Sequence, residues 1–188
     1  APDGETTIMS EAELIQRFSL DRVGASPATF DYAKLDWMNG VYLRELSLDA
    51  YADMLVAYVR EQGYDWDEAR LRAAAPLVQE KITRLGEFEG YAGFLFHDVE
   101  PDLDLLDPTI LERAAEALAG VEPWEATQIE AALKSVCEEL GIKPRQAFPP
   151  VRVAVTGSNV SPGLYESLEL LGREESLARI TRAAAVAP

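Results

Sequence analysis

The spacing of apolar side chains predicts helices along most of the chain. Apolar residues recur every three or four positions in successive segments, which is the period of a helix that buries one face. Polar or charged residues fill the remaining positions of each segment. The pattern predicts helices that begin after Ser10 and that cover about residues 32–46, 48–62, 65–75, 76–85, 108–118, 124–140 and 174–184.

Start and stop signals mark several of these boundaries. Ser10 and Glu13 have the spacing of a capping box, in which each side chain bonds the backbone N–H of the other. The Asp-Pro pair at 107–108 and the Ser-Pro pair at 161–162 combine an N-cap residue with a proline suited to the first helical turn. Gly141 follows an apolar-periodic segment and is expected to end its helix.

Proline and glycine predict interruptions elsewhere. Pro76 would kink an uninterrupted helix, so we expect two helices there, with the second starting near Pro76. The Asn-Gly pair at 39–40 predicts a turn or a helix break. Residues 150–155 alternate and are rich in valine, but the segment is short and follows two prolines, so it is weak evidence for a strand. The sequence therefore predicts an all-α fold.

Composition is that of a folded protein. The chain has 188 residues, of which 48% are hydrophobic, enough for one ordinary domain or two small ones. No run reaches the roughly 20 apolar residues of a membrane span, and the first residues lack the basic and apolar regions of a signal peptide. Cys137 is the single cysteine, so no internal disulfide can form and a cytoplasmic location is expected.

Catalytic and metal-binding patterns are missing. His97 and Cys137 are the only residues of their types and lie far apart, whereas a zinc site needs about four ligands at short spacings. We expect His97 to be an ordinary surface residue and Cys137 to be buried. The sequence contains no glycine-rich phosphate loop, no G-x-S-x-G and no H-E-x-x-H. We therefore expect no catalytic residue, no metal and no cofactor in this chain.

The charge argues against a surface that binds nucleic acid everywhere. Lys and Arg number 17 against 33 Asp and Glu, for a net charge of -16. Phosphate binding depends on basic side chains, so only a local basic face on an acidic body is compatible with RNA as a partner. We expect neither a membrane nor DNA as a partner.

Three regions, in order, resemble bacterial glutamyl-tRNA synthetases, which are class I aminoacyl-tRNA synthetases. Residues 30–44 read FDYAKLDWMNGVYLR and match the family's K-L-x-W-x-N-G-x-Y-hydrophobic-R signature. Residues 76–88 read PLVQEKITRLGEF and are similar to a family helix that ends in a T-L-x-E turn. The third region reads PVRVAVTG over 150–157, SPGLYE over 161–166 and LGREESLARI over 171–180, close to P-L-R-x-A-L-T-G, S-P-G-L-F-E and L-G-K-E-x-x-x-x-R.

The resemblance covers essentially the whole chain and implies a domain plan. It implies a helical connecting segment over residues 1–46, followed by two small helical anticodon-binding subdomains over 47–100 and 101–188. The family's catalytic domain, which binds ATP and magnesium, is not part of this sequence. The implied partners are the anticodon arm of glutamate tRNA and that N-terminal catalytic domain, so this chain would recognise tRNA without having a catalytic site of its own.

The resemblance also implies which residues contact the anticodon. Arg152 matches the family's arginine that contacts anticodon bases, and a guanidinium can stack on a base while donating several hydrogen bonds. Ser161, Pro162 and Leu164 match the loop that packs against those bases. A plain surface role for Arg152, a plain helix start at 161–162 and a core position for Leu164 are the alternatives.

One position departs from the family pattern. Lys81 stands where the family often has an arginine that reads the third anticodon base, and lysine cannot form the same bidentate pair. Discrimination between glutamate and glutamine tRNAs is therefore open. Arg84, one helical turn later, is expected to share the work unless it is simply a solvated charge.

Other basic residues are expected to contact the tRNA backbone. The resemblance implies this for Lys34 and Arg44, which belong to the first signature, whereas Lys143 and Arg145 are candidates because they lie a short distance before Arg152. Trp37 and Tyr42, in the same signature, are expected in the core rather than as platforms for base stacking.

A different class of function competes with this one. The chain could be an acidic helical module, or a paralogue of the synthetase, that binds other proteins and no longer binds tRNA. The charge of -16 and Lys81 favour this alternative, whereas the intact segments around Arg152 and Ser161 favour tRNA binding.

Overall fold

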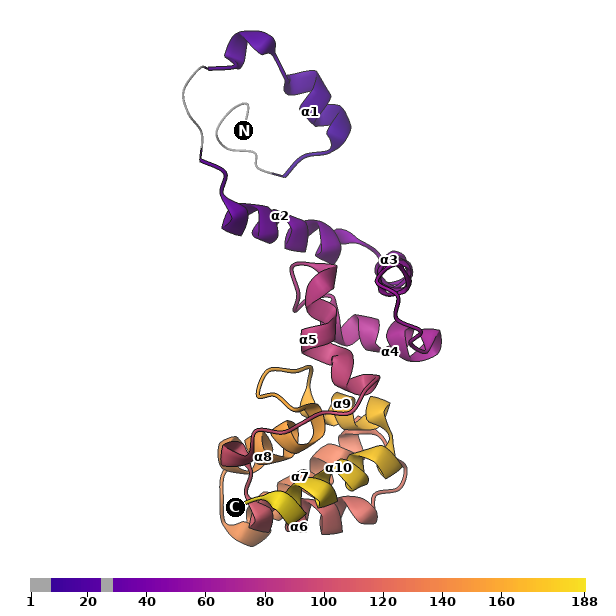
Figure 1. Ribbon diagram of the computed structural model, residues 1–188, viewed down its shortest axis with the longest axis vertical. Helices are drawn as coiled ribbons and strands as arrows, with labels where there is room; N and C mark the ends of the chain where they lie inside the picture. The colour runs from indigo at the N-terminus through magenta and orange to yellow at the C-terminus, as the bar shows by residue number, and fades with distance from the viewer. Residues whose placement is uncertain (1–7, 25–28) are drawn as a thin grey trace.

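Helices form all the regular structure in the residues that the computed structural model describes, 8–24 and 29–188. No β-strand occurs among them, which confirms the all-α prediction. Figure 1 shows the helices arranged along one long axis, with α1 near one end and the C-terminal helices at the other. The α-helices are α1 (Glu11–Arg17), α2 (Tyr32–Glu45), α3 (Leu48–Glu61), α4 (Glu68–Val78), α5 (Phe88–Ala92), α6 (Pro108–Ala119), α7 (Ala126–Leu140), α8 (Pro144–Thr156), α9 (Leu164–Leu171) and α10 (Arg173–Val186), and the 3-10 helices are η1 (Leu20–Arg22), η2 (Leu85–Glu87), η3 (Gly93–Leu95) and η4 (Leu103–Leu105).

Local capping signals set several helix ends as predicted. The Ser10 hydroxyl accepts from the backbone N–H of Glu13 at 3.3 Å, and the Glu13 carboxylate accepts from the Ser10 N–H at 2.9 Å. The Asp107 carboxylate accepts from the N–H of Ile110 at 3.1 Å and caps α6. Gly141 ends α7 in the left-handed conformation with φ 63°. These signals work because each involves only neighbouring residues.

The predicted helix over residues 76–85 is wrong. Pro76 instead lies inside the last turn of α4, which continues to Val78. Pro76 is exposed and cannot donate a hydrogen bond to the carbonyl four residues earlier, and α4 ends two residues later. After Val78 the chain leaves the helix in a turn, in which the N–H of Lys81 bonds the Val78 carbonyl at 2.8 Å. Lys81 is therefore in a loop rather than on a helix.

The predicted break at residues 39–40 is also wrong, because both residues lie inside α2. Gly40 is buried, and a Cβ there would lie 3.2 Å from Cγ2 of Thr83 and 3.0 Å from Nη1 of Arg44. The Asn39 amide donates to the carbonyl of Thr83. The pair therefore serves close packing between α2 and the loop after α4, and does not interrupt the helix.

The Ser-Pro pair at 161–162 does not cap a helix. Helix α9 begins at Leu164, with Gly163 at the N-cap position and no side-chain cap. The Ser161 hydroxyl instead accepts from the guanidinium of Arg152 on α8. A long-range contact has replaced the local cap that the sequence predicted.

The valine alternation over residues 150–155 belongs to a helix that is buried on several sides. Val151, Val153, Ala154 and Val155 are all almost completely buried within α8. A helix packed on most of its surface loses the one-sided apolar pattern of an exposed helix. This burial explains why the segment resembled a strand in sequence.

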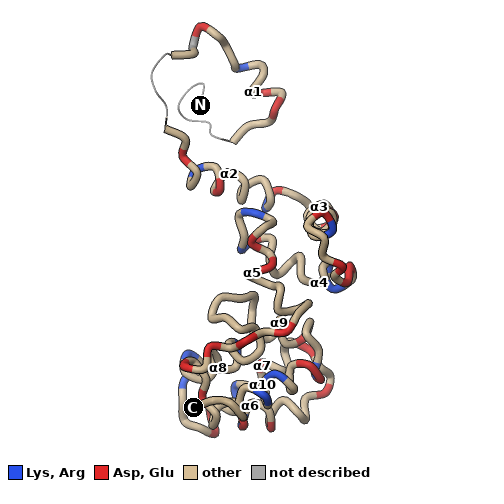
Figure 2. Tube along the Cα trace, in the orientation of Figure 1, with Lys and Arg blue, Asp and Glu red and all other residues tan. Residues whose placement is uncertain are grey.

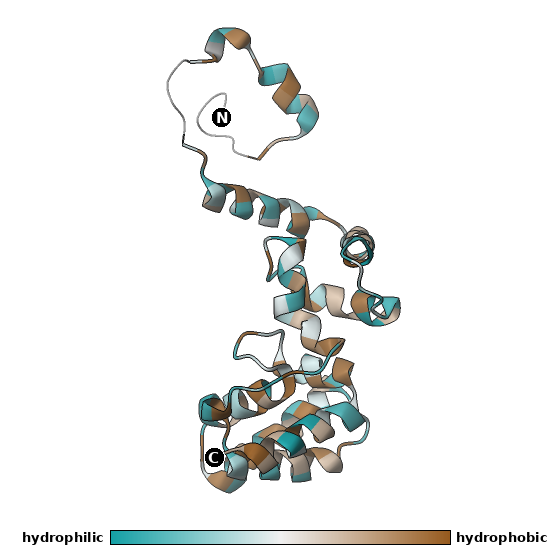
Figure 3. Cartoon of the chain, viewed as in Figure 1, coloured by the Kyte–Doolittle hydropathy of each residue, from teal (hydrophilic) through white to brown (hydrophobic). Residues whose placement is uncertain are grey.

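The core has two connected parts. Helices α3, α4 and α5 bury one set of side chains, and α6, α7, α9 and α10 pack around α8 to bury the other. Figure 3 shows hydrophobic and hydrophilic residues interspersed along these helices. Residues of η3 join the two parts, and Cys137 is buried as predicted. The largest fully buried side chains include Tyr51, Leu55, Leu71 and Phe88 in the first part and Leu111, Leu133, Leu168 and Ile180 in the second.

The N-terminal part exposes many apolar side chains. Helix α1 has no buried residue. Trp37 and Tyr42 on α2 are 50% and 41% exposed, so the expectation that they lie in the core is wrong. The Tyr42 hydroxyl donates to the carbonyl of Met9 at 2.9 Å. In the described residues no helix is both long and apolar enough to cross a membrane.

Gln79 connects α2 to α4, and its replacement should destabilise the protein. Its buried side-chain amide donates to the carbonyls of Leu43 and Leu46, both at 2.9 Å. Gln79→Leu removes both bonds and leaves buried acceptors unpaired, so we expect a loss of about 1–3 kcal/mol in the free energy of unfolding. Urea denaturation would measure it. The exposed Gln62→Leu is the control, with an expected change within about 0.5 kcal/mol, and equal losses would contradict this role.

Candidate functional site

Arg152 and the loop between α8 and α9 form the centre of the site. Nη1 of Arg152 donates to the Pro162 carbonyl at 2.6 Å and to the Ser161 hydroxyl. The side chain is half-buried, and this burial lowers the pKa of the guanidinium. Arginine nevertheless stays protonated in proteins. Three of the predicted tRNA-binding residues thus lie in direct contact, although Arg152 and Ser161 are nine positions apart in the sequence.

The loop is held in place by its own hydrogen bonds. The Thr156 hydroxyl lies 2.9 Å from the carbonyl of Arg152 and 2.8 Å from that of Ser158. Gly157 ends α8 with φ 71°, a conformation that favours glycine. Leu164, by contrast, is only 4% exposed, so its side chain lies in the core beneath the loop. The loop therefore presents Ser161 beside Arg152 of α8, while the buried Pro162 and Leu164 support it.

A cleft of about 380 Å³ opens beside this loop. Tyr91 of α5 and His97 line one side, and Thr156 and Ser158 line the other. Burial raises the pKa of the Tyr91 hydroxyl, and the positive charge of Arg152 acts against that rise. Tyr91 was not singled out from the sequence, because nothing in its local pattern distinguishes it from an ordinary helical residue.

A second basic segment follows α4. Lys81 is exposed there. Arg84 is held by two carboxylates, with Nε 3.4 Å from Asp36 and 3.3 Å from Glu87. Although burial raises the pKa of Glu87, hydrogen bonds from Thr83 hold it below its ordinary value. This loop is therefore fixed, and Arg84 has a structural partner that the sequence did not suggest.

Ion pairing divides the basic residues into two groups. Arg60, Arg72 and Arg84 are among those with a carboxylate within 4.0 Å. A second group has no such carboxylate among the described residues, and Arg70 in that group donates instead to the Leu95 carbonyl. The rest of the second group consists of Lys34, Arg44, Lys81, Lys143, Arg145 and Arg152. Apart from Arg84, none of the cations predicted to contact tRNA has a carboxylate within 4.0 Å among the described residues.

These cations lie at separate places along the molecule. Lys34 and Arg44 are on α2, while Lys143 and Arg145 are at the start of α8. Figure 2 shows basic segments in the loop after α4 and at the start of α8. The structure joins Arg152, Ser161 and Pro162, and leaves the other cations on separate elements.

The remaining candidate features of the described residues are a metal site, His97 and a second cleft. Within the described residues, no three His, Cys, Asp or Glu side chains are grouped to hold a metal ion. His97 is exposed, and its Nδ1 lies 2.9 Å from the Asp98 carbonyl. A larger cleft of about 430 Å³, lined in part by Pro101, Ala183 and Val186, contains none of the predicted site residues.

Comparison with known proteins agrees with this geometry. A family model described as an anticodon binding domain matches residues 50–184. A glutamate–tRNA ligase of Acidothermus cellulolyticus is 43% identical and covers 99% of this chain, and that of Saccharopolyspora erythraea is 45% identical and covers 89%. The chain spans 40% and 37% of those relatives, matching their C-terminal part.

Solved structures show the same fold. A crystal structure of a glutamate tRNA ligase from Elizabethkingia meningosepticum, in complex with its amino acid, superposes with a TM-score of 0.83 at 22% identity. The match covers 100% of this chain and 39% of that one. Together with the family match over residues 50–184, these findings show that the chain belongs to the anticodon-binding domain family, with glutamate–tRNA ligases as its relatives.

Proposed function

We propose that this chain is the anticodon-binding part of a glutamate–tRNA ligase and that it holds the anticodon arm of glutamate tRNA. The observation that carries the proposal is the half-buried Arg152, fixed by Ser161 and Pro162. All three of its hydrogen bonds involve Nη1. The N–H groups of Nε and Nη2 have no hydrogen-bond partner among the described residues, so they are available to a ligand.

This arrangement suits the recognition of single-stranded bases. Anticodon bases are unstacked, so their edges can be read by hydrogen bonds and their faces can stack on a guanidinium plane. Anchoring one nitrogen of Arg152 reduces the entropy lost when the others bind. Lys143, Arg145 and Lys81 would neutralise neighbouring phosphates as point charges. Lys34 and Arg44 on α2 would contact the tRNA backbone farther from the anticodon.

The rest of the ligase would supply the chemistry. The relatives are about two and a half times as long as this chain, which spans 40% of the first of them. We propose that a catalytic domain elsewhere in the full-length protein uses ATP and magnesium to join glutamate to the tRNA, in the cytoplasm. The exposed Trp37 and Tyr42 on α2 would then contact other parts of that protein.

Affinity for the RNA should depend steeply on salt. We expect the isolated chain to bind a stem–loop with the glutamate anticodon weakly, since its net charge of -16 repels phosphate. The logarithm of the binding constant should fall against the logarithm of the salt concentration with a slope of about -2 to -4, for roughly three to five phosphate contacts. Fluorescence anisotropy between low and physiological salt would measure this slope. Binding that does not change with salt would contradict contact with phosphates.

A protein-binding module is the second candidate. The exposed apolar side chains of α1 and α2, together with the acidic surface, favour it. The same titration distinguishes the two, because a chain that only binds proteins would not bind the stem–loop even at low salt.

A further inference from the structure

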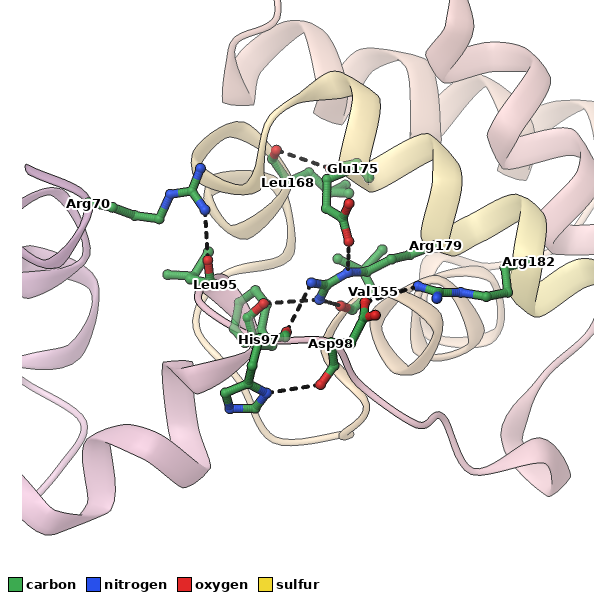
Figure 4. A network of polar contacts seen from close by, with 11 residues as sticks. Arg70, Leu95, His97, Asp98, Val155, Leu168, Glu175, Arg179 and Arg182 are labelled. Carbon is green, nitrogen blue, oxygen red and sulfur yellow. Dashed lines mark hydrogen bonds and ion pairs between the residues drawn. The ribbon is translucent and has the colours of Figure 1, made fainter. Parts of the chain in front are cut away.

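Arg179 is a buried arginine that none of the predicted contacts with tRNA involves. Its side chain on α10 is only 4% exposed. Nη1 donates to the carbonyls of Phe94 at 3.0 Å and Val155 at 2.8 Å, and Nη2 donates to the carbonyl of His97 at 3.1 Å. Nε pairs with the Glu175 carboxylate at 2.7 Å. Figure 4 shows these contacts converging on one guanidinium.

The carbonyls that Arg179 contacts come from two separate segments. Val155 lies in the last turn of α8, where the carbonyls have no partner within the helix. Phe94 and His97 belong to the segment that connects the two parts of the core. On the other side of this segment, Arg70 of α4 donates to the Leu95 carbonyl at 2.8 Å. The connecting segment is therefore held between an arginine of each part (Figure 4).

We propose that Arg179 is a positioning residue for anticodon recognition, which fixes the connecting segment 94–97 against the end of α8. This inference rests on the proposed function. The two segments that Arg179 joins lead directly into the two sides of the cleft beside Arg152, because His97 lines one side and Thr156, next to Val155, lines the other. Arg179 thereby sets the width of the cleft. It also sets the position of the loop between α8 and α9 relative to the loop that carries Lys81.

The chemistry of the site requires an arginine. A planar guanidinium can direct hydrogen bonds to three carbonyls and a carboxylate at once, whereas a lysine ammonium has three donors on one nitrogen. Glu175 balances the buried charge on the outer side. A lysine would preserve the charge and much of the packing but could not reach both segments, so the connection would loosen without removing the helix.

Arg182 provides a matched control. It lies on the same helix, three residues later, and its exposed side chain pairs with Asp98 at 3.3 Å. Exposed pairs of this kind contribute little to stability. Arg182→Lys therefore makes the same chemical change on the same helix and leaves the hydrogen bonds of Arg179 to Phe94, Val155 and His97 in place.

The experiment combines a distance measurement with a binding measurement. Spin labels at Gln62→Cys and Glu138→Cys, both exposed, would report the distance between the two parts, while the buried Cys137 is left in place. We expect a narrow distance distribution for the unsubstituted chain and for Arg182→Lys, and a broader one for Arg179→Lys. Arg179→Lys should also weaken binding of the glutamate anticodon stem–loop by about tenfold, as expected when one oriented contact is misplaced.

A role limited to stability would give a different result. Under conditions in which Arg179→Lys is fully folded, the variant would then show an unchanged distance distribution and an unchanged preference for the glutamate anticodon. This result would overturn the proposal. If Arg179→Lys does not fold, Glu175→Gln keeps the arginine and removes its charge partner, and a smaller shift in the same direction is expected. Unaltered distances and binding in that variant would overturn the proposal as well.

The outcomes also separate this proposal from the proposed function. If the unsubstituted chain fails to bind the stem–loop, the proposed function fails and the positioning role falls with it. If the unsubstituted chain binds and Arg179→Lys binds equally well with equal preference, only the positioning role is overturned.

Discussion

Replacing Arg152 by alanine should weaken binding of the glutamate anticodon stem–loop by about tenfold to a hundredfold, or roughly 1–3 kcal/mol. The substitution removes the donors that are open to a base and also the contacts that hold Ser161 and Pro162. It should also reduce the preference for the glutamate anticodon over a stem–loop in which the three anticodon bases are changed. Anisotropy titrations of both RNAs at one salt concentration would measure both effects.

Arg145→Ala is the control for this prediction. It removes the same charge from α8, at an exposed position in the first turn of the helix. Loss of a phosphate contact should weaken the binding of both RNAs equally and reduce the magnitude of the salt slope by about 1. If Arg145→Ala and Arg152→Ala changed affinity and preference alike, Arg152 would act only as a surface charge.

Leu168→Ala should cause a large loss of stability, about 2–5 kcal/mol in the free energy of unfolding. Leu168 on α9 is completely buried, and alanine would leave a cavity among the C-terminal helices. Helix α9 directly follows the loop that contains Ser161 and Pro162. The Leu168 carbonyl accepts a hydrogen bond from the Trp124 indole at 3.0 Å. Since domains are stable by only about 5–15 kcal/mol, the change should be obvious in thermal or urea unfolding.

Leu103→Ala is its counterpart at a site that is 47% exposed. Surface substitutions of this kind should change the free energy of unfolding by no more than about 0.5 kcal/mol. Similar losses in both variants would mean that the packing of α9 is not as described.

The fold was predictable where neighbouring residues decide the structure. The caps at Ser10 and Asp107 and the stop at Gly141 each depend on groups within a few residues, and the structure has them as predicted. Predictions failed where a distant partner decides. Ser161 accepts a hydrogen bond from Arg152 instead of capping a helix. Gly40 has no side chain, which allows Thr83 to pack closely against α2.

The site was predictable in part. The resemblance singled out Arg152 and Ser161, which the structure brings into contact. It could not reveal that Arg84 is paired with Asp36, that Leu164 is buried or that Trp37 is exposed, because each depends on which helices meet. No local sequence pattern marks Tyr91 as a residue of the cleft or Arg179 as the partner of Phe94, Val155 and His97. Both roles depend on how the helices pack.

The acidity of the chain is compatible with RNA binding because charge is unevenly compensated. Many carboxylates neutralise arginines such as Arg60, Arg72 and Arg113 at the surface. Lys81, Arg145 and other cations predicted to contact tRNA have no such partner in the described part of the chain. Affinity is then set by a few available charges, while the acidic remainder limits binding away from them.

The most direct test of anticodon recognition is to titrate this chain with two tRNA transcripts, one with the glutamate anticodon and one in which the three anticodon bases are changed. Both transcripts carry nearly the same phosphate charge, so a difference in affinity reports the reading of bases. We expect tighter binding to the glutamate anticodon, with the difference reduced by Arg152→Ala. Equal, weak binding to both transcripts would contradict recognition of the anticodon by this chain.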